Sequence, residues 1–217
     1  FSSIPQGEGQ APFRPARVTP RPVMHGSQTA VVVGPSGEEI FVDKYGRVKV
    51  QFYWDRDGKF NAASSCWLRV GTSIAGNKWG TMFIPRIGQE VMVDFLEGDP
   101  DQPIITGSVY NPETMPHYDL PKFKTLTYIK TRTSPDDGKG FNELRFEDKQ
   151  GKEQVFIHSQ KRYDLRAKGS MYETCGGNRQ EVIGVRSDNK PGGNLAITVG
   201  GNYDQHVKAD NYIGIDG

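Results

Sequence analysis

The chain has 217 residues, and its 27 lysines and arginines against 26 aspartates and glutamates leave a formal net charge of only +1. A balance this close to neutral provides no overall field that would attract nucleic acid or an anionic membrane. Hydrophobic residues make up 35% of the chain and 26 residues are glycine, a composition typical of turn-rich β structure and not of helix bundles.

Targeting signals and disulfides are also excluded. No run reaches the roughly 18 apolar residues of a membrane-spanning helix, and no charged-then-apolar segment has the pattern of a signal peptide. Two cysteines far apart in the sequence, Cys66 and Cys175, do not form a disulfide framework. We therefore expect the chain to fold in a reducing, cytoplasmic setting.

Residues 1–22 contain five prolines and no apolar periodicity, which predicts an extended linker. The first residue is Phe1, and the last repeat unit stops at Gly217. We expect the chain to be a fragment of a longer protein, with the linker arriving from an amino-terminal domain that the fragment omits.

Residues 23–112 alternate between short apolar runs and turn signals. Val48, Val50, Phe52 and Trp54 alternate with polar residues, the period of a half-buried strand. Further strands are expected at residues 30–33, 66–70, 80–84, 90–95 and 103–109. Five or six strands without an amphipathic helix predict a small closed β barrel, which leaves no free edge.

Residues 113–141 are polar and turn-rich, and we interpret them as a connector. Strand-like alternation resumes at residues 144–146 and 155–157. We expect residues 142–217 to begin a triple-stranded rod.

From Ala167 onward the sequence repeats every eight residues. An apolar or small residue stands two places before a residue that is glycine in five of the seven repeats, and these glycines or alanines are often followed by Asn or Asp. Each octad is therefore predicted to be a short strand followed by a tight turn. The predicted turn glycines are Gly177, Gly193, Gly201 and Gly217.

One octad cannot bury its own apolar residue, so neighbouring octads must close the rod. Either three successive octads of one chain form a triangular coil, or three chains each supply one side. The fragment would complete only about two single-chain coils, fewer than a solenoid needs, which favours three chains. Val199, Val207 and Ile215 would then meet their copies at the axis. The units at Ile183 and Pro191 are irregular, so regular octads are expected mainly in residues 194–217.

No catalytic or metal-binding motif emerges from the sequence. The stretch from Gly71 to Lys78 departs from a phosphate-binding loop, since its lysine is one place late and Trp79 stands where Ser or Thr is required. The carboxylates of Glu97, Asp99 and Asp101 could bind a divalent cation, but Gly98 and Pro100 among them indicate an ordinary turn. The four histidines lack ligand spacing, and Cys175 fills the apolar slot of an octad, where we expect it to be buried. We expect no enzyme, cofactor or metal.

One surface of the barrel has the composition of a binding platform. Arg47, Lys49, Gln51 and Tyr53 share the polar face of one predicted strand. Basic and aromatic side chains on such a face can stack and pair with single-stranded nucleic acid. The alternatives are an ordinary solvated face or a subunit contact.

Long strings of the sequence resemble the VgrG (valine-glycine repeat protein G) family, the spike of the type VI secretion system and a relative of contractile phage tail spikes. The strings that carry the resemblance include Asp43–Phe52, Trp54–Lys59, Trp67–Val70, Pro85–Val91, Gly98–Asp101, Gly107–Asn111 and Asn142–Asp148. The resemblance implies an all-β chain with an oligonucleotide/oligosaccharide-binding (OB) fold barrel followed by an intertwined homotrimeric β-helix.

The resemblance also implies a function. A VgrG spike is assembled on a contractile tube in the bacterial cytoplasm and secreted by the type VI system without a signal peptide. Its expected partners are two further copies, tube and baseplate proteins, an effector or tip-capping protein and, transiently, a target membrane, whereas nucleic acid is not expected. The predicted function is a membrane-puncturing rod that carries effectors; the alternative is an OB-fold nucleic-acid- or carbohydrate-binding module on a trimeric stalk.

Overall fold

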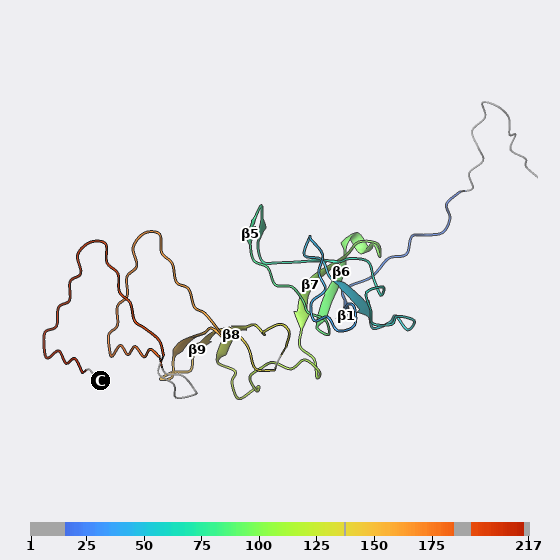
Figure 1. Ribbon diagram of the computed structural model, residues 1–217. Coiled ribbons are helices and arrows are strands. Elements are labelled where there is room, and N and C mark those ends of the chain that lie inside the picture. Colours follow the sequence, from blue (N-terminus) through green and yellow to red (C-terminus); the bar gives the residue numbers. More distant parts are fainter. Residues whose placement is uncertain (1–15, 137, 185–191, 215–217) are drawn as a thin grey trace, which may run out of the picture. The chain divides into compact units, whose positions relative to one another are not determined.

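The computed structural model describes residues 16–136, 138–184 and 192–214 (Figure 1). Its internal contacts divide the chain into two units, Phe1–Tyr163 and Asp164–Gly217. Every assigned strand lies in the first unit, and its single helical element is a short 3-10 turn, Leu96–Gly98. Within the described ranges, none of the helical structure has the length and apolarity to cross a bilayer.

Five strands of the first unit form one mixed sheet, in the order β2 (Lys49–Phe52), β1 (Gln28–Val33), β6 (Glu90–Phe95), β7 (Pro103–Val109) and β3 (Arg69–Val70). All neighbours are antiparallel except β3 and β7. Val48, just before β2, bridges to Leu68, just before β3, by two backbone hydrogen bonds of 3.0 and 2.8 Å. This bridge joins the two outer strands, so the sheet closes into the predicted barrel.

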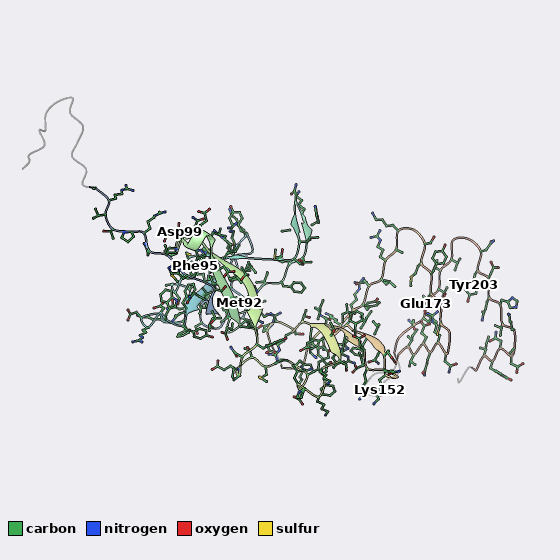
Figure 2. The ribbon with its side chains drawn as sticks, turned by 180° about the vertical axis from the view of Figure 1, so that it is seen from behind. Met92, Phe95, Asp99, Lys152, Glu173 and Tyr203 are labelled. Atoms are coloured by element: carbon green, nitrogen blue, oxygen red, sulfur yellow. The ribbon has the colours of Figure 1, made fainter. Side chains whose placement is uncertain are left out.

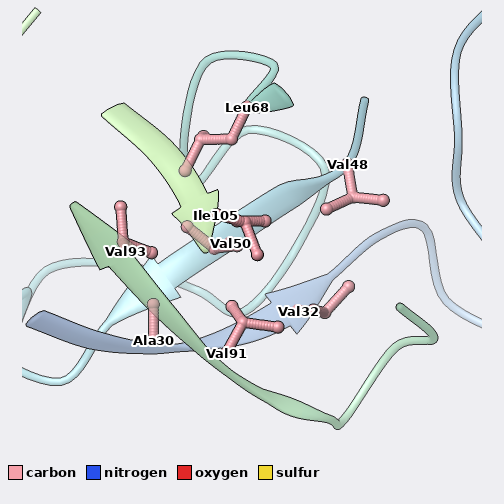
Figure 3. Close-up of a cluster of buried hydrophobic side chains, with 8 residues drawn as sticks. All are labelled: Ala30, Val32, Val48, Val50, Leu68, Val91, Val93 and Ile105. Atoms are coloured by element: carbon pink, nitrogen blue, oxygen red, sulfur yellow. The ribbon is translucent and has the colours of Figure 1, made fainter. Parts of the chain in front are cut away.

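The barrel core forms because strand alternation turns every second residue inward. Cross-strand pairs such as Val32 with Val50 and Ala30 with Val91 align these inward positions. Eight side chains with at most 1% exposure make up the core (Figure 3): Ala30, Val32, Val48, Val50, Leu68, Val91, Val93 and Ile105. Burying each of the larger ones stabilises the fold by about 1.5–3 kcal/mol.

The predicted strands at residues 90–95 and 103–109 have the expected bounds, but three others are shorter than predicted. The strand predicted at residues 66–70 is limited to Arg69–Val70. The strand predicted to run to Trp54 ends at Phe52, because the chain turns there and the Asp55 amide donates a hydrogen bond to the Phe52 carbonyl at 3.0 Å. Trp54 is therefore 59% exposed. The segment predicted as residues 80–84 contributes only Gly80 to a strand.

In place of the strand predicted at residues 80–84, a two-stranded hairpin projects from the barrel. β4 (Ala75–Gly76) pairs antiparallel with β5 (Trp79–Gly80) across a two-residue turn. The loop that resembled a phosphate-binding motif is thus the first half of a hairpin.

A second sheet follows the barrel in the order β10 (Gln154–His158), β9 (Glu143–Glu147) and β8 (Leu126–Lys130), all antiparallel. β9 and β10 contain the two segments predicted to be strand-like. β8 lies inside residues 113–141, the segment interpreted as a connector, where no strand was predicted. Its signal was the alternation of Thr127 and Ile129 around Tyr128, which the turn-rich flanks obscured.

The second unit contains no strand or helix within residues 164–184 and 192–214. Its backbone nevertheless bends at a regular interval, at Lys168–Gly169, Gly176–Gly177, Gly184, Gly200–Gly201 and Lys208–Ala209. These bends are eight residues apart, or sixteen across the undescribed stretch, and they share the phase of the octads. The octad period is therefore present in the backbone of the chain, although the strands expected between the bends are not paired within it.

A candidate assembly interface

The three-stranded sheet has one apolar face that is largely exposed among the described residues of its unit. The pairing register places six side chains on this face, which we call the bare face: Thr127, Ile129, Leu144, Phe146, Val155 and Ile157. Val155 is 65% exposed, Ile157 55% and Ile129 52%. An apolar sheet face of this kind is stable in water only when another surface packs over it.

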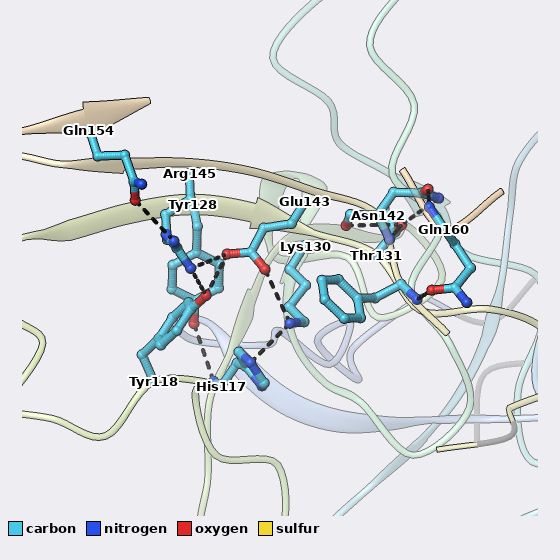
Figure 4. A network of polar contacts seen from close by, with 11 residues as sticks. His117, Tyr118, Tyr128, Lys130, Thr131, Asn142, Glu143, Arg145, Gln154 and Gln160 are labelled. Carbon is cyan, nitrogen blue, oxygen red and sulfur yellow. Dashed lines mark hydrogen bonds and ion pairs between the residues drawn. The ribbon is translucent and has the colours of Figure 1, made fainter. Parts of the chain in front are cut away.

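The opposite face of the same sheet is polar and is covered by the segment that precedes β8. At its centre the Glu143 side chain is only 1% exposed (Figure 4). Its carboxylate accepts hydrogen bonds from the Tyr118 hydroxyl at 2.5 Å and from Lys130 Nζ at 3.2 Å, and it lies 3.4 Å from Arg145 Nη1. Lys130 Nζ also lies 2.9 Å from His117 Nε2. The charged groups of this network are thus paired with one another.

The pKa of Glu143 reflects this environment. Burial by itself would raise the pKa, but the hydrogen bonds from Tyr118 and Lys130 and the charges of Lys130 and Arg145 together hold it below its usual value. Burial and the hydrogen bond to Glu143 raise the pKa of Tyr118, which keeps its hydroxyl protonated as a donor. A cavity of about 490 Å³ lies beside the network. Two cations that line it are paired, Lys130 with Glu143 and Arg132 with Asp136.

Replacing Glu143 with alanine is expected to lower the free energy of unfolding by about 3 kcal/mol, because it leaves two partly buried cations without their carboxylate. Since the folded pKa of Glu143 is depressed, its stabilisation is present above the unfolded pKa and is lost as the pH falls through the folded value. Glu143→Gln should therefore be less stable than the unmodified chain at pH 7 and lose less stability below about pH 4.

Urea unfolding followed by circular dichroism at fixed chain concentration measures both effects. Glu38→Gln, at an exposed position, is the control; equal acid profiles for Glu143→Gln and the unmodified chain would contradict the assignment.

Both outer strands of this sheet present a free edge. β9 is paired on both sides, whereas β8 and β10 are each paired only with β9. Their outer amide and carbonyl groups can pair with another chain. The sheet thus presents a bare face and two edges to a partner.

The octad residues are equally uncovered. Every described residue of 164–183 and 192–214 is exposed, as the side chains along the segment that includes Glu173 and Tyr203 illustrate (Figure 2). Val199 is 45% exposed and Val207 44%, less than Ile197 at 65%. The third predicted axis residue, Ile215, lies outside the described residues.

The predicted turn glycines have different positions in the structure. Gly177 and Gly201 lie at bends, whereas Gly193 has a positive φ of 116° and packs against Gly184. Gly217 lies outside the described residues, as do Val185 and Pro191 of the two irregular octads.

The exposure of Cys175 differs from the prediction. It was expected to be buried, but it is exposed, with its thiol 3.4 Å from the Asn178 carbonyl. Nothing within the chain packs over it, as for the other apolar positions of the octads.

Three of the polar residues on the barrel strand that could have formed a nucleic-acid platform are engaged within the chain. Gln51 is 1% exposed, and its side-chain oxygen accepts from the Phe60 amide at 2.7 Å. Lys49 Nζ donates to the Ala62 carbonyl at 2.6 Å, and Arg47 pairs with Asp43 at 2.7 Å. The loop that follows β2 folds back over Lys49 and Gln51, so these two residues hold that loop in place, whereas Arg47 holds the turn before the strand.

The acidic turn after β6 is also explained by local structure. The Asp99 carboxylate accepts hydrogen bonds from the Asp101 amide at 3.0 Å and from the Gln102 side chain at 3.2 Å. These bonds, the Asp101 amide foremost, lower the pKa of Asp99. Within the part of the chain that the structure describes, no three His, Cys, Asp or Glu side chains form a group able to hold a metal ion.

Two protein families match consecutive parts of the sequence. The family described as the type VI secretion system/phage-baseplate injector OB domain matches residues 38–110. The family described as the bacteriophage T4 gp5 C-terminal trimerisation domain matches residues 127–217. Together they confirm an all-β chain in which an OB-fold barrel precedes a trimerisation domain. The second match covers all but one residue of the three-stranded sheet as well as the octads.

Curated relatives extend the comparison to most of the chain. The type VI secretion system spike proteins VgrG1b and VgrG1c of Pseudomonas aeruginosa are each 53% identical over 176 residues, which is 81% of this chain and 24% of theirs. The actin cross-linking toxin VgrG1 of Vibrio cholerae is 45% identical over 208 residues, 96% of this chain and 18% of the toxin. The chain thus spans about a quarter or less of the length of these relatives.

Proposed function

This chain belongs to the VgrG family of type VI secretion system spike proteins, and we propose that three copies of it form an intertwined rod that is driven through a target membrane and carries effectors. Within this proposal residues 1–22 are the linker from an amino-terminal hub, residues 23–112 the OB-fold collar and residues 113–141 the connector. Residues 142–217 start the triple-stranded β-helix.

The exposure of the octads carries the proposal. Apolar residues recur in them at a fixed interval, and the backbone bends at the same interval, yet every described residue of 164–183 and 192–214 is exposed in the single chain. Fixing a residue costs about 1–2 kcal/mol of backbone entropy, which solvated side chains do not offset. Ordering therefore requires burial against other chains. In a trimer each octad becomes a layer in which Val199, Val207 or Ile215 meets its two copies.

The bare face supports the same assembly. It lies within the segment that matches the trimerisation domain, and it is continuous in sequence with the octads. Three such sheets packed face to face around one axis would bury Phe146, Val155 and Ile157 at the base of the rod. A rod with an apolar axis and ladders between its chains resists bending, which suits a structure that is pushed through a membrane.

The proposal assigns this segment a mechanical role without catalysis. The toxin activity in the name of the Vibrio relative belongs to a protein of which this chain matches 18%. We expect assembly in the bacterial cytoplasm on tube and baseplate proteins, followed by export through the type VI machine without a signal peptide. An effector or tip-capping protein would sit beyond the rod.

Light scattering on the purified chain tests the assembly directly. At micromolar concentration we expect a particle of three times the chain mass, because the rod cannot order as a single chain. A monodisperse monomer would overturn the proposal. A labelled single-stranded oligonucleotide added in low salt should not bind; salt-dependent binding that is lost on replacing Lys49 and Tyr53 would instead support a nucleic-acid module.

A further inference from the structure

The β4–β5 hairpin is the core of a projecting segment, residues 71–84, which we call the apolar arm (Figure 1). Every residue from 73 to 84 is exposed. Trp79 is 66% exposed, Met82 64% and Phe83 61%, and Ile74 is half exposed. Lys78 at the tip is the arm's single charged residue. Contiguous exposed apolar side chains with so little charge are the composition of an interface core.

Near its base the arm contacts its own barrel, where the Gly71 amide donates to the Ile105 carbonyl at 2.8 Å and Met82 lies beside Gly46. Two residue pairs, a backbone hydrogen bond of 3.0 Å from Thr81 to the Ile74 carbonyl and a contact of 2.9 Å between the Ser73 and Thr81 hydroxyls hold the hairpin together. The Trp79 ring lies against Gly76, where a Cβ atom would come within 2.2 Å of it. An isolated two-stranded hairpin is at best marginally stable in water. Trp79 and Phe83 remain exposed, so packing against a surface outside the chain's own barrel would stabilise the hairpin.

The base of the arm is attached to the trimer-forming segment. Arg86, two residues beyond the arm, donates from Nη2 to the Arg132 carbonyl at 2.9 Å and lies 3.9 Å from Glu39. Glu39 in turn accepts a hydrogen bond from the Asp136 amide. Arg132 and Asp136 belong to the segment that matches the trimerisation domain. The barrel and the arm are thereby fixed to the part of the chain that meets its copies.

The reach of the arm fits a neighbouring copy. About six residues on each side of the hairpin, at about 3.3 Å per residue, extend about 20 Å. A domain of about 90 residues has a radius of gyration of about 12 Å. An arm of this length spans from one barrel to the next when barrels lie around one axis. Three arms and three acceptor surfaces then close a ring of identical contacts.

We propose that the apolar arm of each copy packs on the barrel of a neighbouring copy in the trimer, with Trp79 as its anchor. Tryptophan and other large side chains provide most of the binding energy at such contacts. The inference rests on the proposed trimer, to which it adds a second set of contacts outside the rod.

Photo-crosslinking tests the arm in the full chain. We would place p-benzoylphenylalanine at position 79 and, as the matched control, at position 60, because Trp79 is 66% exposed and Phe60, on the barrel and away from the arm, 60%. Irradiation should join two chains from position 79, with the adduct in residues 23–112 of the second chain, and give at least about tenfold less product from position 60.

The outcomes separate this inference from the proposed function. A trimer by light scattering that gives only intramolecular adducts from position 79, or none, would overturn the arm contact and leave the trimer standing. A monomer would overturn both. Trypsin provides a second readout on the unmodified chain: cleavage after Lys78 should be at least about tenfold slower than after Lys59, which is exposed in a barrel loop away from the arm. Equal cleavage rates in the trimer would also contradict the arm contact.

Discussion

Replacing Val155 and Ile157 together with aspartate is expected to convert the trimer into monomers. Both side chains lie on the bare face of the three-stranded sheet, where they are 65% and 55% exposed within the chain. If three sheets pack through these faces, the double substitution removes six apolar side chains from the interface and places six carboxylates there. Each lost side chain forfeits about 1.5–3 kcal/mol, and each unpaired buried carboxylate costs several more. The sum exceeds about 10 kcal/mol per trimer, more than an assembly at micromolar concentration can lose.

The same exposure makes this experiment specific for assembly. Because the two side chains are exposed in the chain itself, their replacement should leave the barrel and the Glu143 network folded. Gln154→Glu is the matched control: it adds a negative charge on the same strand, but on the polar face, where Gln154 already accepts from Arg145 at 3.2 Å. Light scattering should report monomers for the double variant and trimers for the control. A trimer that survives the double substitution would place the assembly contacts in the octads and the apolar arm, and not on the bare face.

The sequence predicted the barrel well because its strands alternate strictly and end at strong turn signals. The inward positions Val48, Val50, Val91 and Val93 are all buried, and the family resemblance drawn from the barrel strings is confirmed. The end of the strand predicted to reach Trp54 was placed too late for a local reason. Trp54 continues the period-two pattern, but a local turn after Phe52 redirects the chain, and no periodicity reveals such a turn.

The assembly surface was only partly visible in the sequence. The octads were recognised because their repeat is long, but β8 was missed because five residues between polar loops give a weak signal. Without β8 the sheet has no defined faces, so the bare face could not be inferred. The polar strand face of Arg47, Lys49 and Gln51 gave the opposite error. Alternation marked it as solvated, and only the fold shows that the following loop covers it.

The octads allow a sharper test, in which neighbouring residues should respond differently to the same change. In an extended strand successive side chains point to opposite sides, so if Val207 faces the axis, His206 faces solvent. Val207→Asp would place three carboxylates in one layer of the rod and remove three buried valines, whereas His206→Asp would place them outside. We expect Val207→Asp to lower the melting temperature of the rod by more than about 10 °C, because a loss of several kcal/mol shifts a transition of this size by that much. We also expect residues 192–214 to become sensitive to proteases in the Val207→Asp variant.

The His206→Asp variant is the control and should melt within about 2 °C of the unmodified chain, as surface substitutions do. Circular dichroism melts and limited proteolysis measure the two effects. If the two variants lose stability equally, Val207 does not point to a shared axis, and the octads are closed in another way, such as by the single-chain coil.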